Sequence, residues 1–232
     1  MKIKNYSFSA LLLLAGLISN AQSGAYIKGG INLANVSVTD NGRVDDANQL
    51  TSFQVGVVGN LKLGTSLLSL QPGILYTGKG AKVQKGTAGQ SGYFKQTFNP
   101  KYIEVPVNLV FKAPLGKSAG VFIGGGPYAA VGIAGNVKTE GTNILRQNYN
   151  RESDIQFSND DPTTFNEEEG AGLGVVRRFD YGLNGTAGIE GKTYVLGLNY
   201  GLGLAKLQSG SNSSADNNNK HRVLSVTLGF KF

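Results

Sequence analysis

LSVTLGFKF, residues 224–232, is the stretch of sequence that decides the fold. In an extended chain its apolar residues share one face, and these are Leu224, Val226, Leu228, Phe230 and Phe232. Small or polar residues occupy the other face, namely Ser225, Thr227, Gly229 and Lys231. This period of two is typical of a β-strand with one apolar and one polar environment. The sequence therefore predicts a β-strand that closes the chain at Phe232.

The same alternation recurs along the chain. It is clear in residues 51–63 and 102–113, and weaker in residues 25–35, 67–78, 121–134, 179–189 and 194–207. The fifth of these strands is interrupted by Gly124-Gly125-Gly126-Pro127. Together with the closing strand, the pattern predicts about eight strands long enough to span a membrane.

The connections between these strands alternate in length. Residues 64–65, 115–117 and 190–192 are tight turns, whereas 36–50, 79–99, 135–178 and 208–220 are long and polar. A barrel with both termini in the periplasm has this order of turns and loops. The fold predicted is all-β: an eight-stranded antiparallel up-and-down transmembrane β-barrel with short periplasmic turns and long extracellular loops.

The N-terminus has the three parts of a secretory signal peptide. Lys2 and Lys4 precede an apolar run at residues 10–18, and Ser19-Asn20-Ala21 is a cleavage site. A transmembrane helix is the alternative, but it needs about 20 apolar residues, roughly twice this run. We therefore predict a signal peptide at residues 1–21 and an outer-membrane β-barrel at residues 22–232.

The composition narrows the function classes. The chain has no cysteine, which excludes disulfides, thiolate metal sites and a lipid anchor on cysteine. Its formal charge of +7 comes from scattered basic residues, so we do not expect nucleic-acid binding. The 34 glycines and the charged fraction of only 16% are unusual for a soluble enzyme and suit narrow, curved barrel strands.

Five segments in sequence order resemble the PorT-like family of small outer-membrane β-barrels, which are often labelled "porin family". The segments are residues 26–35, 70–76, 102–107, 124–128 and 228–232. The resemblance implies an eight-stranded barrel whose C-terminal aromatics, Phe230 and Phe232, are recognised by the barrel-insertion machinery. It implies little about activity, because the founding member is tied to protein secretion and gliding while most relatives have no assigned role, and it carries no catalytic or cofactor-binding residues.

The inward face of the predicted barrel carries charges of both signs. An eight-stranded barrel is just wide enough for its own side chains, so these charges are expected to pair as a polar plug rather than form an ion path. The candidate residues are Glu104, Lys28, Lys62, Lys112 and Asp180. Glu104 is predicted to anchor the plug, with Lys28, Lys62 or Lys112 as its partner.

Catalysis is not expected. The single histidine, His221, shares a strand face with Ser225, but four residues along a strand is about 13 Å, too far for a nucleophile and its base. We interpret His221 as an interfacial residue beside Arg222. No cofactor or metal is predicted, because the acidic residues of the long third loop, Asp160, Asp161 and Glu167 to Glu169, match no calcium-loop spacing.

The third long loop is the candidate for partner recognition. Its length of roughly forty residues suggests function or disorder, and it carries Tyr149, Arg151, Phe157 and Phe165. The leading hypothesis is a non-enzymatic outer-membrane anchor. It would contact outer-membrane lipid and another envelope protein, and a secretion machine is a candidate for that protein. A narrow channel or transporter for small solutes is the alternative.

Overall fold

The computed structural model describes residues 24–37, 39–40, 43–44, 49–64, 67–143, 145–158, 175–207 and 220–232. The predicted signal peptide at residues 1–21 lies outside the described residues. The described chain consists of β-strands and their connections, and it contains no helix long and apolar enough to cross a membrane.

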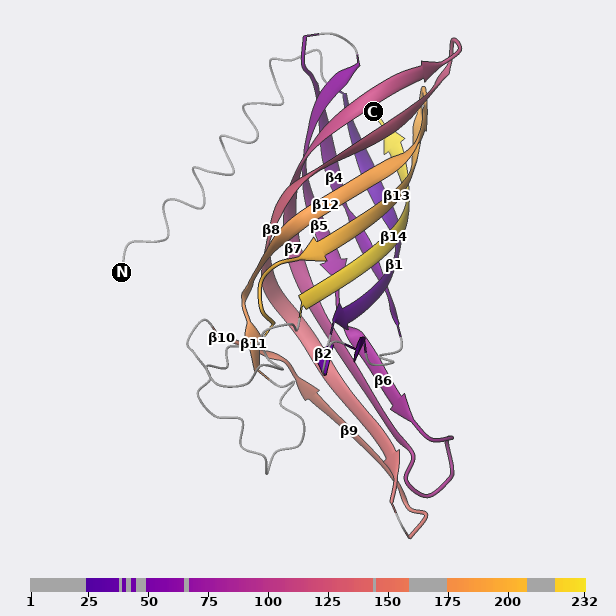
Figure 1. Cartoon of the computed structure of the whole chain (residues 1–232), viewed down its shortest axis with the longest axis vertical. Helices are drawn as coiled ribbons and strands as arrows, with labels where there is room; N and C mark the ends of the chain where they lie inside the picture. The colour runs from indigo at the N-terminus through magenta and orange to yellow at the C-terminus, as the bar shows by residue number, and fades with distance from the viewer. Residues whose placement is uncertain are drawn as a thin grey trace, which may run out of the picture.

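Fourteen strands are described (Figure 1). They are β1 (Gly24–Ser37), β2 (Thr39–Asp40), β3 (Arg43–Val44), β4 (Leu50–Lys62), β5 (Leu68–Gly78), β6 (Ala81–Lys85), β7 (Phe94–Leu115), β8 (Ala119–Thr142), β9 (Asn148–Asp154), β10 (Gln156–Ser158), β11 (Val175–Arg177), β12 (Phe179–Gly191), β13 (Tyr194–Gly203) and β14 (Lys220–Lys231).

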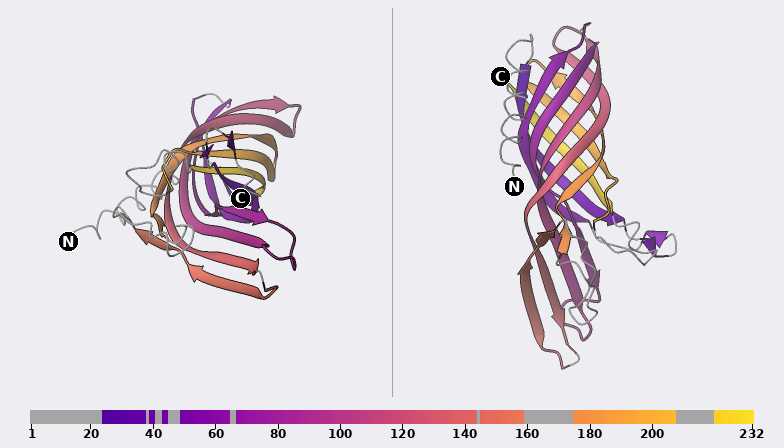
Figure 2. Two further views of the ribbon diagram at one scale, coloured as in Figure 1. Left: turned by 60° about the horizontal axis from the view of Figure 1, so that its bottom comes forward. Right: turned by 90° about the vertical axis from the view of Figure 1, so that its left-hand side faces the viewer.

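Eight of these strands form a closed antiparallel ring. Its order is β1, β4, β5, β7, β8, β12, β13 and β14, and β14 pairs with β1 to close it. Sequence neighbours are ring neighbours throughout, apart from the short strands in the long connections, so the barrel is up-and-down as predicted. The two ends of the described chain lie side by side, because Tyr26 pairs with Lys231. We call the end of the barrel that holds the C-terminus and the tight turns the terminal end, and the opposite end the distal end (Figures 1 and 2).

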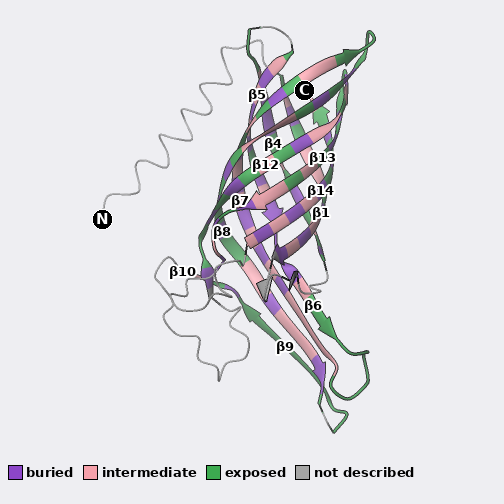
Figure 3. Ribbon diagram, viewed as in Figure 1, coloured by how far each residue is buried: buried purple, intermediate pink, exposed green. Residues whose placement is uncertain are grey.

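The ring gives each strand the two faces that the sequence predicted (Figure 3). Along β14, Val226, Leu228 and Phe230 are exposed on the outer wall, while Ser225 and Thr227 are 4% exposed inside the barrel. The outer wall is therefore a continuous apolar surface, as lipid contact requires, and every ring strand is paired on both sides.

The Gly124-Gly125-Gly126-Pro127 segment does not interrupt β8, which runs unbroken from Ala119 to Thr142. A Cβ atom at Gly126 would collide with the backbone oxygen of Val107, and one at Gly124 would collide with that of Leu109. Glycine is therefore required here because β7 and β8 approach more closely than side chains allow.

Beyond the ring, four strand segments continue as a sheet at the distal end (Figure 2, right). We call it the outer sheet. It consists of β6, residues 94–101 of β7, residues 134–142 of β8, and β9, in that order. The predicted loops 79–99 and 135–178 were therefore wrong in part, since much of both is strand.

The outer wall changes character where the outer sheet begins. Within the ring, β7 presents apolar residues such as Val107, Leu109 and Phe111 to the outside. Past a register shift between Lys101 and Tyr102, the same wall continues with Lys101, Thr97 and Lys95. The lipid-facing band on this side therefore ends near Lys101.

Candidate functional site

The distal half of the barrel interior contains a buried network centred on Lys79. Its Nζ atom lies 2.7 Å from Glu104 Oε2 and 2.8 Å from Asp180 Oδ2, and all three side chains are less than a tenth exposed. The Tyr128 hydroxyl donates to Asp180 Oδ2 (3.1 Å), and the Asn184 amide donates to Glu104 Oε1 (3.3 Å). The ammonium group also lies 4.1 Å from the centroid of the Tyr128 ring. Each charge is thus paired and hydrogen-bonded, which offsets the cost of its burial.

Glu104 belongs to this network, but its ion-pair partner is Lys79, so the prediction that Lys28, Lys62 or Lys112 would be its partner was wrong. Lys79 was assigned to a loop because apolar alternation stops at Gly78. The inward register of β5 nevertheless continues through Thr77 to Lys79, and both are buried. Extending the inward period of two by one step past Thr77 would have found it.

The other predicted plug residues make different contacts. Lys28 donates to Asn199 Oδ1 (2.9 Å), which also accepts from Thr186 (3.0 Å). Near the terminal end, Lys112 and Lys231 both pair with Glu190, at 3.0 Å and 2.8 Å. Lys62 is exposed at the end of β4 and joins none of the ion pairs among the described residues. Asp180 faces inward as predicted.

His221 is not the interfacial residue that the sequence suggested. It lies at the distal end of β14, but it is 1% exposed and its Nε2 atom is 3.3 Å from the Tyr102 hydroxyl. The Tyr102 and His221 rings meet edge to face, with centroids 5.5 Å apart. The His221 side chain is buried because it points into the barrel, although the residue lies near the distal rim.

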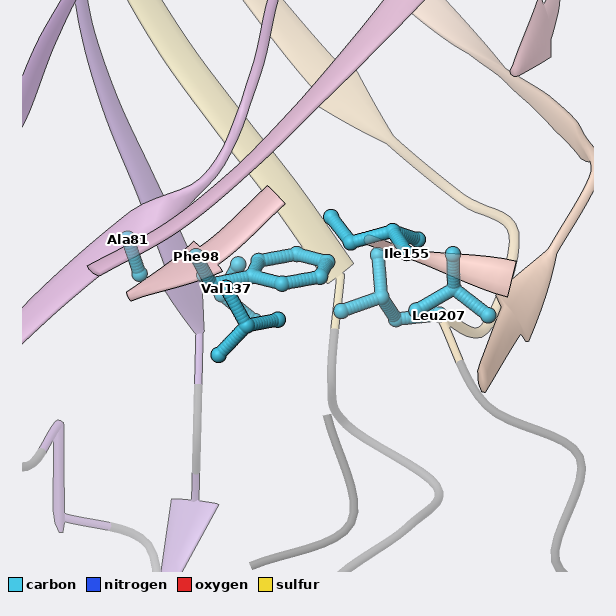
Figure 4. Close-up of a cluster of buried hydrophobic side chains, with 7 residues drawn as sticks. Ala81, Phe98, Val137, Ile155 and Leu207 are labelled. Atoms are coloured by element: carbon cyan, nitrogen blue, oxygen red, sulfur yellow. The ribbon is translucent and has the colours of Figure 1, made fainter. Parts of the chain in front are cut away.

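An apolar cluster covers the distal mouth of the barrel, on the distal side of the polar network. Figure 4 shows its buried members, which are Val36, Ala81, Phe98, Val137, Ile155, Val176 and Leu207. Phe157 packs against this cluster and against the Tyr102 ring, at a centroid distance of 5.9 Å. We call this group the outer cap. It was not predicted, because its seven buried residues come from seven separate strands and connections.

Little free volume is left beneath the outer cap. A cavity lined by Lys28, Lys79, Glu104 and Asn199, among others, measures about 30 Å³. That is space for only a few water molecules. The side chains that line this cavity therefore leave little free volume in the distal half of the interior.

The residues expected to face partners lie in different environments. Phe230 and Phe232 are 59% and 75% exposed at the terminal end, next to β1. Tyr149 and Arg151 belong to β9 and not to a loop, and Phe157 is part of the interior packing. Phe165 and the acidic residues 160–169 lie outside the described residues.

The outer sheet carries a charge cluster on the face that continues the outer wall. Glu140 Oε2 lies 2.8 Å from Lys95 Nζ, and Glu140 Oε1 lies 2.9 Å from Lys138 Nζ. Hydrogen bonds from these two lysines lower the pKa of the Glu140 carboxyl to about 2. The carboxylate therefore stays ionised at any physiological pH.

Comparison with known proteins agrees with this architecture. A family model described as "Outer membrane protein beta-barrel domain" matches residues 20–209. A search of curated proteins by sequence gave no match.

The chain is also similar to several solved structures. Ail of Yersinia pestis is 14% identical, with 90% of this chain and 99% of Ail covered at a TM-score of 0.41. Neisserial surface protein A is 11% identical, with coverage of 90% and 97% and a TM-score of 0.41. OprG of Pseudomonas aeruginosa is 14% identical, with coverage of 93% and 99% and a TM-score of 0.40.

Proposed function

The chain belongs to the outer membrane protein beta-barrel domain family and is an outer-membrane barrel. From this premise we propose that it is a non-enzymatic, closed anchor that presents its outer sheet to another molecule. The packing of charged and apolar side chains inside the barrel is the observation that supports this proposal most directly. Ion pairs at Lys79 and Glu190 occupy the interior, and the outer cap covers its distal mouth.

The outer sheet is the second line of support. Residues 94–101 of β7 extend roughly 25 Å at the usual rise per strand residue. All seven residues of β9 are exposed. Because short turns are typically periplasmic and long connections extracellular, the outer sheet would stand on the cell surface.

The surroundings of His221 support a non-enzymatic role. A lipid-modifying hydrolase of the serine type needs a histidine base beside a reachable nucleophile. His221 is buried against Tyr102 instead, and it is the one histidine of the chain.

We propose that the partner of the outer sheet is another envelope protein, and a component of a secretion machine stays a prediction from the PorT-like resemblance. We also propose that Phe230 and Phe232 serve as the signal for the barrel-insertion machinery, since both aromatic rings face outward at the terminal end.

The rival function is a narrow channel for small solutes, and conductance separates the two. We expect the pure protein in planar bilayers to give no steady solute-sized currents, because buried ion pairs and the outer cap lie across the interior. A sixteen-stranded porin in the same bilayers serves as the positive control. Steady currents that scale with the amount of inserted protein would overturn the closed-anchor proposal in favour of the channel.

Surface presentation can be tested by labelling, since the natural chain has no cysteine. Leu145, at the tip between β8 and β9, is 78% exposed, and Lys117 lies in the tight turn between β7 and β8 at the terminal end. We expect a membrane-impermeant maleimide to label Leu145→Cys on intact cells. Lys117→Cys, the matched control, should react only after the outer membrane is permeabilised. The reverse pattern would contradict the orientation.

A further inference from the structure

The tip of the outer sheet contains a pocket, and we propose that it binds a neutral saccharide. This inference rests on the proposed function, since it requires the outer sheet to face the outside of the cell. The pocket measures about 340 Å³, within the range of small-ligand sites. Its lining comes from the loop before β7, the end of β8 and the start of β9, and we call it the tip pocket.

Backbone hydrogen bonds fix the walls of the tip pocket. Gly86, Gly89 and Gly92 adopt positive φ values and shape the loop between β6 and β7. Gly92 N donates to Thr142 O (3.1 Å), and Thr142 N donates to Tyr93 O (2.9 Å), so this loop is tied to the end of β8. The pocket is therefore formed before any ligand arrives, which lowers the entropic cost of binding.

The opposite wall is held in the same way. Asn143 accepts the backbone N–H of Gln147 with its Oδ1 atom (2.8 Å), which closes the turn between β8 and β9. The Thr142 hydroxyl donates to Asn148 Oδ1 (2.8 Å). Since that oxygen is engaged, the amide nitrogen is the group that Asn148 can offer to a ligand as a donor.

The lining combines two aromatic residues with planar polar groups. Tyr93 and Tyr149 border the pocket, together with Glu140, Asn148 and Asn150. Carboxylates and amides present paired acceptors and donors that match neighbouring hydroxyls, and the Tyr93 ring can cover the apolar face of a sugar. The Tyr149 ring lies over Gly141, on the face of the sheet opposite to Glu140 and Asn150, so it borders the pocket without joining this polar set. Glu140 is held in place by Lys95 and Lys138, so its carboxylate is pre-positioned as an acceptor.

Other ligand classes fit the tip pocket less well. No lysine or arginine is among its lining residues, so a phosphate or sulfate would meet the Glu140 carboxylate without a lining cation. A metal ion is disfavoured because, in the described part of the chain, no group of three or more histidine, cysteine, aspartate or glutamate residues is placed to hold one. Beyond the two tyrosines the lining is polar or small, which disfavours a lipid chain. Of the ligand classes considered, a neutral polyhydroxylated molecule therefore fits the tip pocket best.

The test uses the full-length protein, folded in detergent, on a printed array of defined oligosaccharides. The array carries neutral probes ending in mannose, galactose or N-acetylglucosamine, and anionic sulfated or sialylated probes. We expect binding to a subset of the neutral probes. Tyr93→Ala and Asn150→Ala should each weaken binding about tenfold, the loss that corresponds to one stacking or hydrogen-bonding contact.

Arg151→Ala is the matched control, because neighbouring residues of a strand point to opposite faces, so Arg151 and Asn150 lie on different faces of β9. All variants must first keep the gel migration of the folded barrel. Binding to anionic probes alone, or equal losses in the Arg151 and Asn150 variants, would overturn the tip-pocket inference. A further outcome is that the protein binds no neutral probe while its tip labels on intact cells and its barrel does not conduct. That combination would overturn this inference and leave the proposed function intact.

Discussion

Lys79→Met is expected to destabilise the folded barrel by about 3–5 kcal/mol, the usual cost of leaving a buried charge without its partner. Lys79 is 3% exposed and is the shared partner of Glu104 and Asp180. Methionine fills a similar volume, so the loss would come from two carboxylates that remain buried together. The measurement is urea unfolding of the barrel in lipid vesicles. Gel migration of unboiled samples can follow it, since the chain has no tryptophan for fluorescence.

Lys95→Met is the matched control for this experiment. Lys95 also pairs with a glutamate at 2.8 Å, but both side chains of that pair are more than a quarter exposed. Solvent screens such a pair, so the unfolding midpoint should hardly move. The triple variant Lys79→Met, Glu104→Gln, Asp180→Asn should recover part of the loss, because it removes the buried charges altogether. Equal midpoints for Lys79→Met and the wild type would refute the role of this network.

The second large effect is expected from Val226→Lys, at about 2–4 kcal/mol of folding free energy. Val226 is 55% exposed on the outer wall, near the middle of β14, and its strand neighbours are Ile31 and Leu198. All three face lipid, so a lysine there would place its ammonium group in hydrocarbon. The reversible unfolding midpoint in vesicles measures the effect.

The control for this prediction is a lysine at a position nearer to the membrane surface. Leu228→Lys lies two residues closer to the terminal end, where a lysine reaches the membrane surface more easily, so its cost should be smaller. Equal costs at both positions would mean that the outer wall is not the lipid-facing surface. The inward neighbour Thr227 is unsuitable as a control, because its hydroxyl accepts from Asn199 (3.0 Å) and donates to Gly197 O (3.2 Å).

The barrel could be predicted from sequence because hydrocarbon imposes one simple pattern. Outward residues of a lipid-facing strand must be apolar, and in residues 102–113 and 224–232 apolar residues do occupy alternate positions. The continuation of β7 through residues 94–101 could not be predicted in this way. Its outward residues face water, so Lys95, Thr97 and Lys101 break the apolar alternation while the backbone stays extended.

The site was predicted in its parts and not in its pairings. The inward direction of Glu104 and Asp180 follows from strand parity alone. The partners of these carboxylates depend on the ring order and on the stagger between strands, which place Lys79 beside a residue 101 positions later in the chain. Tyr102 and His221 meet across 119 positions for the same reason. Contacts between residues so far apart in the chain cannot be predicted directly from a single sequence.

The continuity of β7 and β8 also has a mechanical meaning. These strands of 22 and 24 residues run without a break from the tight turn at the terminal end into the outer sheet. A pull on the tip would therefore load their shared ladder of hydrogen bonds in shear, along its length, instead of peeling the bonds one at a time. We expect a partner tugging on this surface to be resisted by the whole barrel wall, which is a useful property in an attachment to the envelope.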